Sequence, residues 1–147
     1  MRKQRIYLET TILNYFFQSD RGIMHTATVK LFEEIKSGKF EAYASTVVIS
    51  ELSDAPEPKR TNMLNLIGKY GIIILEADEE AGRLADLYIK EKIIPKRYKR
   101  DGVHIAIAAI NELDIILKIT TCIVLLFAYN VNMRYTHWRN ICDKIQR

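Results

Sequence analysis

Residues 5–16 read RIYLETTILNYF. The first four of them form a short apolar run typical of a β-strand, and the acidic residue Glu9 follows that run directly. The segment after Glu9, through Asn14 to Phe17, has the character of a turn that enters a helix. A carboxylate placed straight after a buried strand is unusual, so this stretch indicates a strand of a sheet with a polar group at its carboxyl end.

Outward from this stretch, strand and helix patterns alternate along the chain. Further apolar runs predict strands over 40–44, 72–75 and 115–119, and the β-branched run 72–75 is expected to be buried. Helical patterns lie between them, over 26–37, 47–52, 58–69, 78–89 and 101–112. This alternation predicts an α/β fold with three layers, in which a central, mostly parallel sheet carries helices on both faces.

Bulk composition narrows the class of protein. A chain of 147 residues, 48% hydrophobic and 27% charged, is expected to form one soluble domain with a real core. Its longest charge-free stretch, 119–133, is too short and polar to span a bilayer, so no membrane partner is expected. Cys122 and Cys142 form no CxxC pair, which favours a reducing, cytoplasmic location. The net charge of +4 suits a polyanionic substrate, although charge alone favours nothing beyond solubility.

Three acidic residues stand where parallel strands or their neighbouring helices deliver side chains to one crevice. Glu9 and Glu51 follow the first two predicted strands, and Asp101 opens the helix before the last one. Clustered carboxylates repel one another unless a cation neutralises them, and hard oxygen ligands select Mg²⁺ or Mn²⁺. The structural alternative for each residue is a helix cap or a solvated helix position.

Two further features lie beside Asp101. His104 shares its helix face, either as a ligand or acid–base group or, more commonly, as a buried histidine that packs and forms hydrogen bonds. A basic loop precedes it, and its cations are candidates for contacts with a nucleic-acid backbone, the alternative being a solvated loop. These candidates are Lys96, Arg97, Lys99 and Arg100. No HExxH, Gly-rich phosphate loop or GxSxG motif supports a zinc, nucleotide or serine-hydrolase site.

Three segments in order resemble the motifs of PIN domains, over about residues 5 to 118. IYLETTILNYF (6–16) resembles the first motif, STVVISELSDAPEPKR (45–60) the second, and IIPKRYKRDGVHIAIAAINELDIIL (93–117) the third. The resemblance implies a PIN-like fold and a Mg²⁺- or Mn²⁺-dependent ribonuclease, of the kind that includes VapC-like toxins paired with an antitoxin protein. It also implies a homodimer.

Carried over by motif, the resemblance makes Glu9, Glu51 and Asp101 the catalytic metal-site acids. Thr10 would then be the hydroxyl residue that helps to order the site, and Asn14 a polar neighbour of the pocket. The first acid is a glutamate where most of the family has aspartate. The alternative interpretation is a degenerate, non-catalytic PIN domain that binds RNA or a protein partner.

The C-terminal segment departs from this pattern. Of the 18 acidic residues, only Asp143 lies beyond Asp114, and the helical periodicity fades over the same stretch. Residues 1–118 are therefore interpreted as the PIN-like domain, and 119–147 as an atypical segment that either stands apart or completes the same domain.

Overall fold

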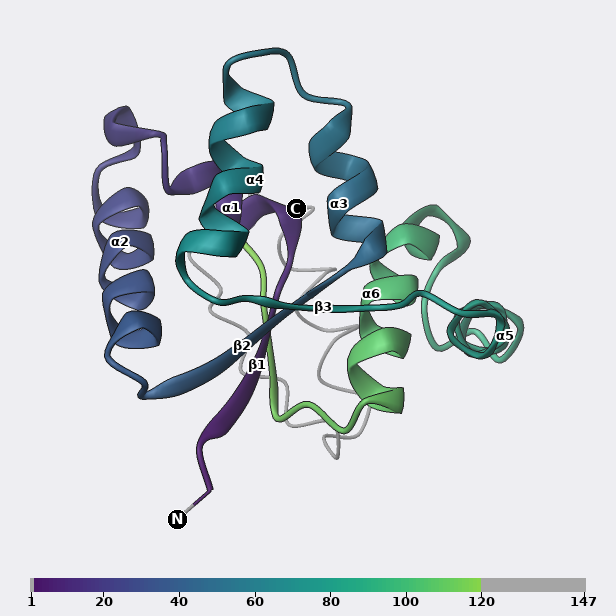
Figure 1. Ribbon diagram of the computed structural model, residues 1–147. Coiled ribbons are helices and arrows are strands. Elements are labelled where there is room, and N and C mark those ends of the chain that lie inside the picture. The colour runs from purple at the N-terminus through teal and green to yellow at the C-terminus, as the bar shows by residue number, and fades with distance from the viewer. Residues whose placement is uncertain (1, 120–147) are drawn as a thin grey trace.

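A computed structural model describes residues 2–119, which fold around one parallel β-sheet (Figure 1). Of the C-terminal segment, only Ile119 lies within the described residues. The described strands are β1 (Gln4–Leu8), β2 (Phe40–Ser45), β3 (Ile73–Leu75) and β4 (Ile115–Leu117). Their order across the sheet is β3-β2-β1-β4, and every neighbouring pair is parallel.

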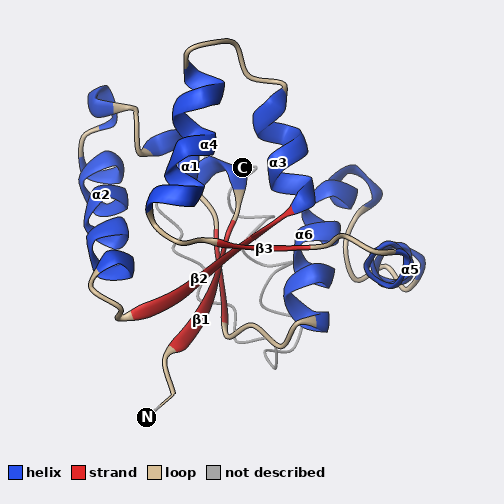
Figure 2. Ribbon diagram, viewed as in Figure 1, coloured by secondary structure: helices blue, strands red, loops and turns tan. Residues whose placement is uncertain are grey.

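Helices connect the strands and cover both faces of the sheet (Figure 2). The α-helices are α1 (Thr10–Tyr15), α2 (Ile23–Lys36), α3 (Thr46–Ser53), α4 (Lys59–Lys69), α5 (Glu79–Lys90) and α6 (Lys99–Ile110). The short 3₁₀ helices are η1 (Ser19–Arg21) and η2 (Lys96–Tyr98). Helices α1 to α4 lie on one face of the sheet, where they contact one another, and α5 packs on α6 at the other face. The predicted three-layer α/β class is confirmed.

Strand β1 occupies the centre of the sheet because its side chains are apolar on both faces. Ile6, Tyr7 and Leu8 are all at most 1% exposed. Strand β2 pairs with one edge of β1 and β4 with the other. The core extends from these strands to helix residues on both faces, among them Phe32 and Ile107, which are fully buried.

Among residues 2–119, the strand predicted to be buried at 72–75 is instead an edge strand. β3 begins at Ile73, which is 44% exposed, and only Ile72 before it is buried. The apolar run was correctly recognised as a strand, but its place at the end of the sheet depends on the chain order of the crossovers. An edge strand has a neighbour on one side alone.

Two helix boundaries also differ from expectation. Helix α2 begins at Ile23 rather than at residue 26, directly after Gly22, whose φ of 53° belongs to the left-handed region that glycine adopts readily. Helix α6 begins at Lys99, so Asp101 lies in its first turn and is not its N-cap. No helix within residues 2–119 has the length and apolar character needed to cross a membrane.

The carboxyl ends of β1, β2 and β4 meet at one edge of the sheet. Leu8 pairs with Leu117, and the Glu9 amide donates to the Leu117 carbonyl at 3.1 Å. At the end of β2, Ser45 caps α3, whose first turn therefore starts from the same edge. The residues that directly follow β1, β2 and β4 are thus brought together, as expected for an open α/β sheet.

Candidate metal centre

Glu9 is buried at the junction of β1 and α1, where its side chain caps the helix. Its Oε2 accepts hydrogen bonds from the Thr11 amide at 3.0 Å and from the Thr11 hydroxyl at 2.6 Å. The residue is 6% exposed. Its second oxygen, Oε1, forms no hydrogen bond within residues 2–119. One carboxylate oxygen is therefore fixed by the helix and the other remains available to a ligand.

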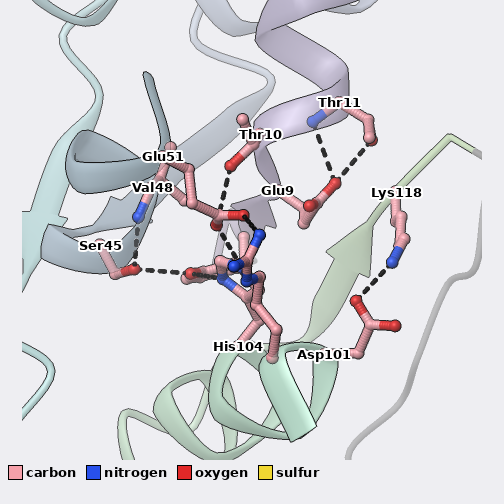
Figure 3. A network of polar contacts seen from close by, with 11 residues as sticks. Glu9, Thr10, Thr11, Ser45, Val48, Glu51, Asp101, His104 and Lys118 are labelled. Carbon is pink, nitrogen blue, oxygen red and sulfur yellow. Dashed lines mark hydrogen bonds and ion pairs between the residues drawn. The ribbon is translucent and has the colours of Figure 1, made fainter. Parts of the chain in front are cut away.

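Glu51 reaches the same place from α3. Its Oε1 accepts hydrogen bonds from the Thr10 hydroxyl at 3.1 Å and from His104 Nε2 at 2.8 Å (Figure 3). Its Oε2 lies 3.8 Å from Nη1 of Arg100. Burial raises the pKa of Glu51, but the hydrogen bonds from His104 and Thr10 and the nearby charges outweigh burial and hold the pKa below its usual value. Glu51 is therefore a carboxylate at neutral pH.

His104 projects from α6 into the interior and is 2% exposed. Its Nδ1 lies 2.6 Å from the Tyr7 hydroxyl, which lies 2.7 Å from the Ser45 hydroxyl. Ser45 in turn accepts from the Val48 amide at 3.4 Å. Burial raises the pKa of Tyr7 well above its usual value, so its phenol keeps its hydrogen. A continuous hydrogen-bonded chain thus runs from α3 through β2, β1 and α6 to Glu51.

The donor atoms of Glu9, Glu51 and His104 all lie within 4.8 Å of one another, close enough to hold one metal ion. Two carboxylates this close repel each other, and Glu9 is almost fully buried. Hydrogen bonds from the protein hold Glu51 and one oxygen of Glu9. Glu9 Oε1 has no such partner within residues 2–119. A cation is the chemical species that this donor set lacks, so the residues fit a bound metal.

Asp101 does not belong to that cluster. Its Oδ1 forms an ion pair with Nζ of Lys118, the residue after β4, and Figure 3 shows the two side chains facing each other. Sequence reasoning placed Asp101 with Glu9 and Glu51. The structure brings it to the same edge of the sheet but gives its carboxylate a cation from the protein.

The supporting residues also have definite places. Thr10 orders Glu51 rather than Glu9, whose partner is Thr11. Asn14 lies one helical turn beyond Thr10 on α1, and its Oδ1 is buried without a hydrogen-bond partner within residues 2–119. An unpaired buried amide oxygen is costly, and a water or cation in this region would satisfy it.

The basic residues predicted to contact RNA are exposed and surround the start of α6. Lys96 and Arg97 belong to η2, and the Arg97 guanidinium lies 4.9 Å from the centre of the Tyr98 ring. Lys99 forms an ion pair with Asp86 of α5 at 3.2 Å. Arg100 faces the acidic cluster through Glu51.

Sequence reasoning missed four participants: Tyr7, Ser45, Thr11 and Lys118. Lys118 was detectable, because it follows strand IIL as directly as Glu9 follows strand RIYL. Ser45 stands directly before an apolar helix, and a serine at that position predicts an N-cap. Tyr7 gave no signal, because an aromatic residue within a buried strand is ordinarily core.

The fold and this cluster define a three-layer α/β protein with a candidate metal centre at the carboxyl edge of its sheet. The chain matches no protein-family model, and no curated protein matches it.

Proposed function

We propose that this chain is a metal-dependent endoribonuclease of the PIN-domain type that hydrolyses RNA phosphodiester bonds. The observation that carries the proposal is the convergence of Glu9 and Glu51, from different strand ends, with His104 within 4.8 Å. Two neighbouring carboxylates can bind a metal ion, and the exposed basic residues beside them can bind the phosphates of a polyanionic substrate.

Mg²⁺ or Mn²⁺ is the metal that the proposal assigns. Carboxylate oxygens are hard ligands, which these ions prefer, whereas a structural zinc site uses cysteine and histidine. Glu9 Oε1 and Glu51 Oε2 are the oxygens that would hold the ion, because the other oxygen of each carboxylate is engaged by protein donors. When bound, such an ion polarises a phosphoryl oxygen and activates a water for in-line attack.

The protein residues then divide the remaining work. Thr11 and Thr10 fix the two carboxylates through their hydroxyls. Arg100, exposed beside Glu51, would bind a phosphate of the RNA backbone next to the ion. Lys96, Arg97 and Lys99 would extend that contact along the strand. The reaction requires no covalent nucleophile from the protein.

The test is cleavage of a mixed RNA pool by the wild type with Mn²⁺, with EDTA, and by Glu51→Gln. Cleavage should require the metal and fall by at least about 100-fold in the variant, the scale of loss seen when a charge-stabilising group is removed. Glu57→Gln is the matched control: Glu57 is an exposed glutamate paired with Arg60, and its loss should leave cleavage unchanged. Cleavage that does not require the metal, or equal activity in Glu51→Gln and Glu57→Gln, would contradict the proposal.

A second candidate function is that of a non-catalytic PIN-like domain that binds RNA or a protein partner. It is favoured by the ion pair between Lys118 and Asp101, because an ammonium group occupies the third acid. Such a domain would not bind Mn²⁺ at this cluster. Binding of Mn²⁺ by the wild type and its loss in Glu51→Gln would therefore favour the enzyme.

The biological setting in the leading proposal is that of a VapC-like toxin. Such a protein works as a homodimer in the cytoplasm and is held inactive by an antitoxin. Size-exclusion chromatography with light scattering would test the dimer: a monomer at micromolar concentration would contradict it. Growth arrest on expression, relieved by Glu51→Gln, would support the toxin role.

A further inference from the structure

We infer that His104 is a positioning residue for Glu51 and not a ligand of the metal. Its ring carries a hydrogen on Nε2 and donates that hydrogen to the Glu51 carboxylate. The inference rests on the proposed metal centre for its functional meaning, but the state of the ring can be measured without any metal.

The imidazole ring of His104 contacts the Glu51 carboxylate directly. His104 Nε2 lies 2.8 Å from Glu51 Oε1. A carboxylate oxygen accepts and cannot donate, so the hydrogen of this bond belongs to Nε2. A nitrogen that carries hydrogen has no lone pair in the ring plane to offer a metal.

The other ring nitrogen, Nδ1, is hydrogen-bonded to Tyr7. If Nδ1 carries no hydrogen, Tyr7 donates to Nδ1, Ser45 donates to the Tyr7 oxygen, and the Val48 amide donates to Ser45. Every polar hydrogen in this series of hydrogen bonds then has an acceptor. If Nδ1 also carried a hydrogen, Tyr7 would donate to Ser45, and the Ser45 hydroxyl hydrogen would have no acceptor within residues 2–119.

Burial makes a hydroxyl hydrogen without an acceptor costly at this place. Tyr7 and Ser45 are 0% exposed and His104 is 2% exposed, so water cannot replace a missing partner. The arrangement that satisfies every donor is therefore the favoured one. Its donors all point the same way, from the Val48 amide to the Glu51 carboxylate.

This geometry makes an oxygen-only metal centre. The hydrogen bond from His104 fixes Glu51 Oε1, so Oε2 is left for the ion, as Thr11 leaves Oε1 of Glu9. With the imidazole withheld, the site offers carboxylate oxygens and water, which favours Mg²⁺ and Mn²⁺ over Zn²⁺. The chain Ser45–Tyr7–His104 is then a determinant of metal selectivity.

The deciding measurement is ¹⁵N–¹H NMR of the histidine rings in the metal-free protein, assigned through His104→Gln. We expect the spectra to show hydrogen on Nε2 of His104. A ring with hydrogen on Nδ1 alone would leave Nε2 free to bind metal and would overturn the inference. His25, whose Nδ1 lies 3.0 Å from the Tyr15 carbonyl, is the internal reference.

The metal-loaded arm uses Mn²⁺ as probe. Pulsed electron paramagnetic resonance should show no coupling of the ion to a directly bound imidazole nitrogen, and such a coupling would refute the inference. His104→Gln, which keeps a donor near the Nε2 position, should bind Mn²⁺ within about threefold of wild type, whereas His104→Leu should bind about tenfold more weakly. Equal loss in both folded variants would point to a ligand role.

These arms separate the inference from the proposed function. If the wild type binds no Mn²⁺, the proposed metal centre fails, while the ring state from the metal-free spectra still decides whether His104 positions Glu51. If Mn²⁺ binds through an imidazole nitrogen, the centre stands and the positioning role of His104 falls.

Discussion

Lys118 Nζ forms an ion pair with Asp101 Oδ1 at the carboxyl end of β4, with the two side chains 24% and 21% exposed. The pair joins the residue after β4 to the first turn of α6. It gives Asp101 a cation of its own beside a cluster whose other carboxylates have no ammonium partner. Of the three acids, Asp101 is paired with Lys118 and Glu51 faces the Arg100 guanidinium at 3.8 Å. Glu9 has no cationic side chain paired with it within residues 2–119.

Removal of this ammonium group should strengthen metal binding. Lys118→Met releases Asp101, whose carboxylate then adds negative charge next to Glu9 and Glu51. We expect Mn²⁺ affinity measured by calorimetry to rise roughly three- to tenfold, equivalent to about 1 kcal/mol. The gain should vanish in the Lys118→Met, Asp101→Asn double variant. An affinity that falls in the single variant would show that Lys118 does not compete with the ion.

Tyr7→Phe should destabilise the fold more than an otherwise similar change. It removes one hydroxyl and leaves the Ser45 hydroxyl hydrogen without an acceptor and His104 Nδ1 without a donor, which costs about 1–3 kcal/mol. Tyr43→Phe is the control, because Tyr43 donates to Glu41, a partly exposed carboxylate. Urea unfolding monitored by circular dichroism measures both. A smaller loss for Tyr7→Phe than for Tyr43→Phe would contradict the chain of buried hydrogen bonds.

Alkaline pH should destabilise the wild type through Tyr7. Burial raises the pKa of Tyr7 in the folded protein above its value in the unfolded chain, which is 10.0. The unfolded chain therefore loses this proton first, so the stabilisation is complete below pH 10 and declines as the pH rises above it. The slope of unfolding free energy against pH above about pH 10 should be shallower in Tyr7→Phe. Identical slopes would be evidence against a buried, neutral phenol.

Acid pH should destabilise the protein through Asp114, far from the metal centre. Hydrogen bonds from the Arg2 guanidinium and the Arg5 amide lower the pKa of Asp114 below its usual value. The folded state therefore holds this group deprotonated more readily than the unfolded chain. The resulting stability is present above about pH 4 and is lost as the pH falls through the folded pKa. Asp114→Asn should be less stable than wild type at pH 7, and the difference should shrink as the pH falls below about 4, as measured by urea unfolding at each pH. A difference that does not change with pH would contradict this assignment.

Arg100 should contribute more to RNA binding than its neighbour Lys99. Both are exposed cations at the start of α6, but Arg100 faces Glu51 and Lys99 is paired with Asp86 on α5. With cleavage blocked by Glu51→Gln, Arg100→Gln should weaken binding of a short RNA and lower the salt slope by about one unit. Lys99→Gln should change both less. Equal effects would show that the basic residues act only as a diffuse charge.

Local sequence patterns predict the strands, the helices and the edge of the sheet at which a functional site is expected. Short apolar runs that alternate with periodic helices are a local property, so the strands and helices and the α/β class were readable. Glu9 and Glu51 were found for the same reason: each follows a predicted strand, and parallel strands deliver their carboxyl ends to one edge.

Tertiary structure alone decided which side chains meet. The partner of Thr10 is Glu51, 41 residues away, and the partner of Tyr7 is His104, 97 residues away. No local pattern encodes such pairs, because they depend on strand order, register and the rotation of each helix about its axis. The same reason explains why Asp101 was grouped with Glu9 from the sequence but lies against Lys118. Two residues can be sent to the same edge by their strands, yet the packing of α6 against β4 determines which cation the carboxylate finds.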